Sequence, residues 1–388
     1  SASNLTSGTV PDARFPATLP AASGANLTSL PPNRVNRNII VNGACEIAQR
    51  GVSSTSTGYG CVDRMQMVTA STDQLAFAQK QTDDFPDGFS KCWEFDVTTA
   101  ESALDADEII YMRYLVEAQD LRPLYNANGT GKNFTLSFYV KAAQTGTYNI
   151  GIHKSDGGTR FITNTYTISA ANTWQRVVWN ITGDTGTTGM AFDNGQGFQI
   201  SFMLAAGTNY TSGGVQSSWG SFSNSLMAGG HAVNVVSSTD NYWRITGIQL
   251  ELGSVATDFE HRSFGDELAR CQRYCCKWDA NGATANNHSR FAPGYCNNTS
   301  NGLLFFSHPV PMRAVDGRTI THNIGQLNVL TPGDSQNSPT LTLESSSQSN
   351  QITVINAALQ SGRTQHEVLI ARVGNGQTDW YIIISSEL

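Results

Sequence analysis

Charged residues are scarce in this sequence. Only 14% of the 388 residues are Asp, Glu, Lys or Arg, and the formal net charge is −7. A weakly acidic chain has no broad basic field to attract phosphate backbones, so we expect no nucleic-acid partner. The low charge also disfavours long solvated helices, whereas 36 glycines and abundant Ser, Thr and Asn favour short strands joined by polar turns. The sequence therefore predicts an all-β fold.

Long apolar runs and a regular cysteine framework are missing as well. The most apolar stretch, residues 380–384, has the length of a strand and is far shorter than the roughly 18 residues of a membrane-spanning helix, so we expect no membrane insertion. The seven cysteines have no regular spacing, which favours synthesis in a reducing cytoplasm over a disulfide scaffold. The chain starts without Met or a secretory signal, and we expect it to be a fragment with further sequence upstream.

The first predicted segment, residues 1–37, carries a short repeat. Asn-Leu-Thr-Ser occurs at 4–7 and again at 26–29, in a background rich in Pro, Ser and Ala. Its scattered apolar residues are too few for a core of their own but suffice for a narrow seam between parallel chains. We predict an extended, trimeric shaft, and a disordered linker is the alternative that composition leaves open.

Residues 38–262 show the period-two alternation of half-buried strands and are predicted to form a jelly-roll β-sandwich. Residues 105–117 fit a helix or a strand equally well. Four tryptophans lie within strand patterns and are expected in the core: Trp93, Trp174, Trp179 and Trp243. The clearest strand patterns are at 134–140, 148–152, 166–168, 174–181, 198–202 and 243–250.

One convincing helix follows, at residues 263–278, and it links two β domains. Ser263 is placed to cap it with Asp266 as partner, and Leu268, Cys271 and Cys275 share one helical face. The remainder, 279–388, is predicted to be a second, smaller β-sandwich that forms the tip. Its expected strands are at 302–309, 319–322, 326–330, 340–343, 351–355, 368–373 and 379–385.

Three groups of residues resemble tailed-bacteriophage tail fibre proteins. The opening stretch at 2–14 resembles the shaft repeat that precedes many fibre tips. Residues 38–43 (NIIVNG), with 49–51 and 63–64, resemble the entry to a jelly-roll domain that these fibres share with carbohydrate-binding modules. The longest match covers 245–253 (ITGIQLELG), 256–260, 267–268 and 271–274. The pair Cys275-Cys276 departs from the family pattern, in which an aromatic or charged residue usually follows Arg-Tyr.

The resemblance implies the distal, receptor-binding part of a tail fibre in the virion. Such a fibre is a homotrimer, is joined to other phage tail proteins through its upstream region, and binds a host surface glycan or outer-membrane receptor. Two alternatives remain. One is a structural protein that decorates a capsid or baseplate, and the other is a glycan depolymerase.

Candidate receptor-binding residues lie in the Gly-, Ser- and Asn-rich stretch at 205–241. Trp219 and Tyr210 are suited to stack on a sugar ring while Asn209 and Ser218 bond its hydroxyls, which is the chemistry of lectin sites. The alternative is that Trp219 caps the sandwich.

Metal sites and catalysis have little support, so we predict no cofactor and no enzymatic activity. The sequence contains no Gly-x-Ser-x-Gly nucleophile elbow, no His-Glu-x-x-His zinc motif and no phosphate-binding loop. The acidic residues 83–84 and 105–108 are interpreted as solvated faces. Zinc candidates lack paired cysteine knuckles, and calcium candidates lack a spaced acidic loop. The zinc candidates are Cys271, Cys275, Cys276, His288 and Cys296. The calcium candidates are Glu251, Asp258, Glu260 and His261.

Overall fold

The computed structural model divides into two units, Ser1–Val35 and Asn36–Leu388. It describes residues 36–388 except 157, 187–188, 280–289, 324–326, 332–333, 339, 345–347, 360 and 374–379. The predicted shaft, up to Val35, therefore lies outside the described residues. Within them the expected all-β class is confirmed, because the chain forms mainly antiparallel strands.

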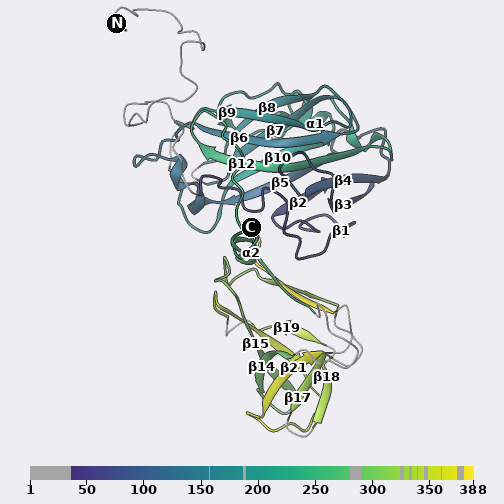
Figure 1. The fold of residues 1–388 in the computed structure, drawn as a ribbon, viewed down its shortest axis with the longest axis vertical. Helices are drawn as coiled ribbons and strands as arrows, with labels where there is room; N and C mark the ends of the chain where they lie inside the picture. The colour runs from purple at the N-terminus through teal and green to yellow at the C-terminus, as the bar shows by residue number, and fades with distance from the viewer. Residues whose placement is uncertain are drawn as a thin grey trace, which may run out of the picture. The chain divides into compact units, whose positions relative to one another are not determined.

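Two six-stranded sheets stack to form the first domain (Figure 1). Successive strands of the chain alternate repeatedly between the two sheets, which is the connectivity of a jelly roll. The first sheet runs β1 (Ser53–Ser54), β3 (Ala76–Thr82), β4 (Cys92–Thr99), β12 (Tyr242–Leu252), β6 (Phe134–Ala142) and β9 (Gln175–Ile181). The second runs β11 (Gly220–Ser221), β8 (Arg160–Ile168), β7 (Gly146–Lys154), β10 (Gln196–Ala206), β5 (Ile109–Glu117) and β2 (Met65–Ala70).

The core of this domain lies between the two sheets. Trp93 and Trp243 are fully buried there with their ring centres 6.2 Å apart, and Trp179 is buried as well. Trp174 differs from the prediction: it is half-buried, and its indole N–H donates to the Asp84 carboxylate at 3.0 Å. The ambiguous segment 105–117 contains a strand, β5, because its alternate residues face the core and it pairs with β10 and β2.

The predicted helix exists but is shorter than expected. Its N-terminus is as predicted, because the Ser263 hydroxyl accepts from the Asp266 amide at 3.2 Å and donates to its carboxylate at 2.6 Å. Helix α2 (Phe264–Gln272) ends before Cys275, and Cys275–Asp279 forms strand β13 instead. The other helices are α1 (Thr208–Thr211), η4 (Ala118–Leu124), η5 (Asn224–Leu226) and η6 (Val235–Ser237), and no helix in the described ranges has the length and apolarity to cross a bilayer.

The C-terminal domain contains a seven-stranded and a three-stranded sheet, and the predicted strands are all present. Three further strands were not predicted: β13, where the helix was expected to continue, and β14 (Arg290–Cys296) and β18 (Asp334–Ser338), neither of which shows apolar alternation. The larger sheet runs β18 (Asp334–Ser338), β17 (Leu327–Thr331), β21 (Val368–Val373), β14 (Arg290–Cys296), β15 (Asn301–Ser307), β20 (Ile352–Ala358) and β19 (Leu341–Leu343). The smaller runs β13, β22 (Tyr381–Ser385) and β16 (Thr319–His322).

Candidate functional site

The four residues predicted to contact a receptor lie on the segment between β10 and β12. Asn209 and Tyr210 belong to α1, whereas Ser218 and Trp219 directly precede β11. Asn209 and Ser218 are exposed, and both aromatic residues are half-buried. Among the described residues, no hydrogen bond or ring contact joins Tyr210 to Trp219.

The Trp219 indole is attached to the edge of the first core. It packs on the Phe198 ring with centroids 6.0 Å apart, and its Nε1–H donates to the Thr182 carbonyl at 2.8 Å. Arg160 donates to the Trp219 carbonyl at 3.0 Å. These contacts favour the capping interpretation of Trp219, and its role in receptor binding stays a prediction.

Tyr210 belongs to a separate apolar cluster on the outer side of the second sheet. Its ring packs there with Ile109, Tyr111 and Met203, and its carbonyl accepts from the Ala228 amide at 3.0 Å. The loop that carries it is therefore fixed to the sheet by apolar contacts.

A cleft of about 750 Å³ lies within the second unit. One wall is the segment 50–60, which includes β1, and the other is a face of the three-stranded sheet. Nine of its lining side chains carry a hydroxyl group. The cleft is lined by Arg50, Ser53, Ser54, Ser56, Thr57, Tyr59, Gly60, Gly317, Thr319, Thr321, Tyr381, Ile383, Ser385 and Glu387.

Strand alternation explains this hydroxyl-rich wall. Ile382 and Ile384 of β22 are fully buried in the C-terminal core, so Tyr381, Ile383 and Ser385 point to the opposite face. The register of β16 and β22 pairs Thr319 with Ser385 and Thr321 with Ile383. Directly paired residues share a face, so β16 adds its two exposed threonines to the cleft.

A charged pair forms the base of the cleft. Arg50 donates to the Glu387 carboxylate at 3.0 Å and to the Ser385 hydroxyl at 2.8 Å. Glu387 also pairs with Arg64, which is 1% exposed and stacks on the Tyr274 ring at 3.6 Å. The Glu387 carboxylate is therefore held between two guanidinium groups.

The Tyr59 hydroxyl supplies an open hydrogen-bonding position. The oxygen is buried and has no hydrogen-bond partner among the described residues, although the side chain lines the cleft. Burial raises the pKa of Tyr59 to about 12, so the phenol is neutral near pH 7 and can donate as well as accept. Buried polar groups are rarely left unpaired, which makes this hydroxyl a position for a ligand or for water.

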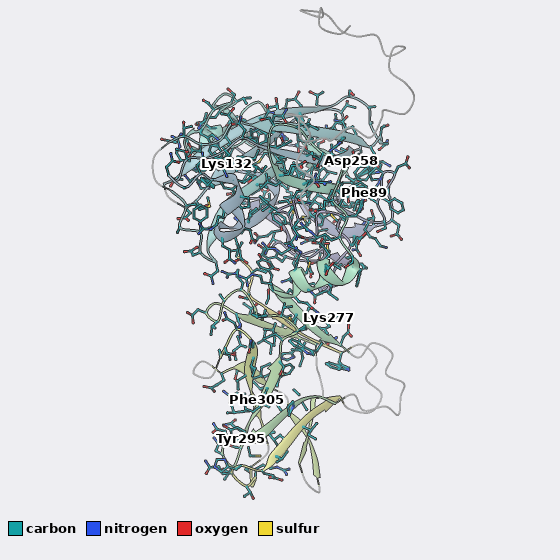
Figure 2. All side chains as sticks on the ribbon, turned by 60° about the vertical axis from the view of Figure 1, so that its left-hand side comes forward. Phe89, Lys132, Asp258, Lys277, Tyr295 and Phe305 are labelled. Carbon is teal, nitrogen blue, oxygen red and sulfur yellow. The ribbon has the colours of Figure 1, made fainter. Side chains whose placement is uncertain are left out.

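Strand β13 borders the same face and adds charge to it. Lys277, labelled in Figure 2, stands opposite Ile383 in the register and pairs with Asp279 at 3.0 Å. Its ammonium lies 5.9 Å from the centre of the Tyr381 ring. Tyr381 is half-buried, so part of its ring is open to a planar apolar ligand face.

The chemistry of the cleft suits binding of a neutral polyhydroxylated ligand. Its walls supply hydroxyl donors and acceptors together with two tyrosine rings. Glycoside hydrolysis uses two carboxyl groups roughly 5–9.5 Å apart, and Glu387 is the only carboxylate among the lining residues described.

Two of the carboxylates considered for calcium, Glu251 and Glu260, have other partners. Glu251 accepts from the Thr257 amide at 2.9 Å and from its hydroxyl at 2.7 Å. Glu260 accepts from the amides of Asn36 and Asn38 at 2.7 and 2.8 Å. These groups fasten the start of the second unit to the segment that follows β12.

Two of the cysteines considered for zinc lie in separate packing environments. Cys271 packs with Val41 and Ile47, and Cys296 lies in the C-terminal core. His288 lies outside the described residues. Buried thiols of this kind behave as small apolar side chains.

The residues of the cleft were missed in the sequence because its two walls are more than 250 residues apart in the chain. In β22, Tyr381 and Ser385 flank three consecutive isoleucines, so the strand has no polar alternation that would have marked a second, exposed face. Nothing in the sequence indicated which segment its polar face meets.

Comparisons with known proteins give only weak structural matches. No protein-family model matches the chain, and a search of curated proteins finds no match. The enzymatically active domain of tailspike protein 4 from bacteriophage CBA120 matches with 14% identity and a TM-score of 0.32, over 56% of this chain and 22% of that one. The family 11 carbohydrate-binding module from Clostridium thermocellum matches with 11% identity and a TM-score of 0.28, over 53% and 98%. The xylan-binding domain of Xyn10C from Paenibacillus barcinonensis matches with 8% identity and a TM-score of 0.27, over 54% and 99%. At these TM-scores nothing is carried over from them to this chain.

Proposed function

We propose that this chain is the distal, receptor-binding part of a phage tail fibre and that it adsorbs to the host by holding a surface glycan in the cleft between residues 50–60 and strands β16 and β22. The observation that carries the glycan part is the hydroxyl-rich cleft with the unpartnered Tyr59 hydroxyl. The tail-fibre part rests on the sequence resemblance at residues 2–14 and 245–274.

The charge distribution of the cleft favours a neutral sugar over an anion. Arg50 and Arg64 are both engaged by Glu387, so neither presents a free positive charge to a ligand. Hydroxyl groups pair with sugar hydroxyls in both directions, and tyrosine rings cover the apolar face of a sugar ring. One such site binds weakly, and a trimer with three copies gains attachment strength through avidity.

The proposed role is binding without hydrolysis. Among the lining residues described, Glu387 is the only carboxylate and it is paired with two arginines, whereas glycoside hydrolysis uses two carboxyl groups. A depolymerase role is the second candidate, and an assay for reducing ends released from the polysaccharide distinguishes it from binding alone.

The test uses the intact chain on immobilised surface polysaccharides from a panel of bacteria and on whole cells. The double variant Thr319→Val with Thr321→Val removes two cleft hydroxyls while preserving side-chain volume and strand propensity. We expect glycan binding to fall about ten-fold, or roughly 1.4 kcal/mol, because two ligand hydrogen bonds are lost.

Thr342→Val is the matched control, since Thr342 is an exposed threonine on β19 outside the cleft. It is expected to bind as the parent chain does. Equal binding by the double variant would refute the cleft assignment. Release of reducing ends from the bound polysaccharide would favour the depolymerase instead.

The molar mass of the intact chain in solution tests the fibre part of the proposal. Light scattering on the intact chain should give a trimer, because the apolar residues of 1–35 need partner chains to be buried. Deletion of residues 1–35 should weaken association without unfolding the sandwich, because the core residues described between its two sheets begin at Ile40. A monomeric intact chain at micromolar concentration would contradict the trimer.

A further inference from the structure

Three carboxylates meet at one end of the first domain. Asp73 lies on the connection between β2 and β3, and Glu101 and Glu108 lie on the connection between β4 and β5. One oxygen of each lies within 4.8 Å of the others. Glu101 and Glu108 are each 2% exposed, whereas Asp73 is exposed and forms the open side of the cluster.

An unpartnered buried atom points to a missing ligand at this cluster. The Glu101 Oε2 atom is buried and has no hydrogen-bond partner among the described residues. None of the ion pairs found in the described ranges involves any of the three carboxylates. Like charges gathered in a buried place without a cation are costly, and a bound cation removes that cost.

From this arrangement we infer that Asp73, Glu101 and Glu108 form a binding site for a calcium ion. Calcium prefers oxygen ligands at 2.3–2.6 Å and accepts irregular geometry. Oxygens no more than 4.8 Å apart leave a point within about 2.8 Å of all three, so a small movement of exposed Asp73 brings each into range. Magnesium requires about 2.1 Å and a near-ideal octahedron, which demands a larger rearrangement.

The ion would brace the connection between β4 and β5, which is hydrogen-bonded to the start of α1. The Glu108 carboxylate accepts from the Asp105 amide at 2.6 Å, and the Glu108 carbonyl accepts from the Gly207 amide at 2.8 Å. The Ala106 carbonyl accepts from the Asn209 amide at 2.9 Å. A cation on Glu108 therefore stabilises the turn that holds Asn209 and Tyr210, and this inference does not depend on the proposed glycan cleft.

The test uses the intact chain, stripped with EDTA and dialysed free of chelator. Calorimetric titration with calcium chloride should show one ion per chain, and calcium should raise the melting temperature by several degrees because it binds the folded state only. Magnesium chloride should bind at least ten-fold more weakly. Asp73→Asn, at an exposed position that tolerates substitution, should weaken calcium binding at least ten-fold and abolish most of the rise in melting temperature.

Asp107→Asn is the matched control, because Asp107 is an exposed carboxylate on the same connection and outside the cluster. It should keep the calcium response of the parent chain. Glu101→Gln should also lose the response while staying folded without metal, since it removes a buried charge. Absence of calcium heat and of any melting shift in the parent chain would overturn the inference, as would an unchanged response in Asp73→Asn. The inference is also overturned if the parent chain does not respond to calcium while Glu101→Gln has a higher melting temperature. That result would mean that the carboxylates only share a proton.

Discussion

At the scale of single residues, Trp219 is the side chain whose role is most open to test. Trp219→Ala removes the packing on Phe198 and the hydrogen bond to the Thr182 carbonyl. Because the indole is half-buried, we expect the free energy of unfolding to fall by about 2–3 kcal/mol in urea titrations. Attachment to host cells should then fall only in step with the folded fraction.

Trp219→Phe serves as the control, since it keeps an aromatic ring beside Phe198 and loses only the indole N–H. We expect it to cost about 1 kcal/mol. If Trp219→Ala leaves stability unchanged and attachment drops about ten-fold, the sequence prediction of a receptor contact holds and the capping interpretation fails.

His231 gives the fold a defined response to acid. Its Nδ1 atom accepts from the Asn149 amide at 3.1 Å, and burial lowers the pKa of His231 to about 4. The unfolded state binds a proton near pH 6.5 and the folded state does not, so stability is full above pH 6.5 and is lost as the pH falls toward 4. Over that range the loss attributable to His231 is about 2–3 kcal/mol.

The measurement compares unfolding free energies of the parent chain and His231→Asn between pH 7 and pH 4. Asn keeps an acceptor for the Asn149 amide but does not titrate, so the parent chain should lose more stability than the variant as the pH falls. Burial acts in the opposite direction on Glu101 and Asp63, whose pKa values it raises to about 7 and about 6, and both groups cancel in the difference. Parallel pH curves would contradict the assignment.

At the scale of elements, strand β22 serves two purposes at once. Its isoleucines Ile382 and Ile384 close the C-terminal core, and its other face forms a wall of the cleft. Because strand periodicity separates the two sets of residues, substitutions on the cleft face leave the core packing intact. This separation is what makes the threonine variants of β16 a clean test of binding.

The cap of α2 offers a prediction about a whole element. Ser263→Ala removes the acceptor for the Asp266 amide, and we expect a loss of about 1 kcal/mol in the free energy of unfolding. Ser263→Thr keeps the hydroxyl and should retain most of that energy. Equal losses in both variants, measured by chemical unfolding, would mean that the cap does not stabilise the helix.

At the scale of the whole molecule, Glu387 joins segments from both ends of the second unit. It is the ion-pair partner of Arg64, which is buried between the rings of Tyr114 and Tyr274. Glu387→Gln leaves that guanidinium buried without a counter-charge, and we expect the free energy of unfolding to fall by about 3–5 kcal/mol.

Asp83→Asn is the comparison, because Asp83 pairs with Lys91 while its side chain is 77% exposed. Exposed pairs contribute about 0–1 kcal/mol, so this variant should unfold nearly as the parent chain does. Similar losses in the two variants, measured in urea, would show that burial does not distinguish these ion pairs.

Local patterns in the sequence determined much of the fold. Period-two alternation placed most of the strands from 134 onward and the burial of Trp93 and Trp243. The capping pattern placed the start of α2 at Ser263. Each of these features depends on residues close together in the chain. The same patterns did not find β18, which is uniformly polar, or the end of α2 at Gln272, where pairing with β22 overrides the helical pattern.

Only the tertiary structure decided the sites. The cleft joins residues 50–60 to β16 and β22, and the cluster of Asp73, Glu101 and Glu108 joins two connections that are far apart in the sequence. The sequence predicts a solvated face that includes Glu108, yet Glu108 is 2% exposed and its carbonyl accepts from the Gly207 amide. Periodicity reports which face of an element is buried, but not which distant segment covers that face. The contacts that pair distant segments arise from the order of strands in the sheets, and this order is set by the packing of the whole chain.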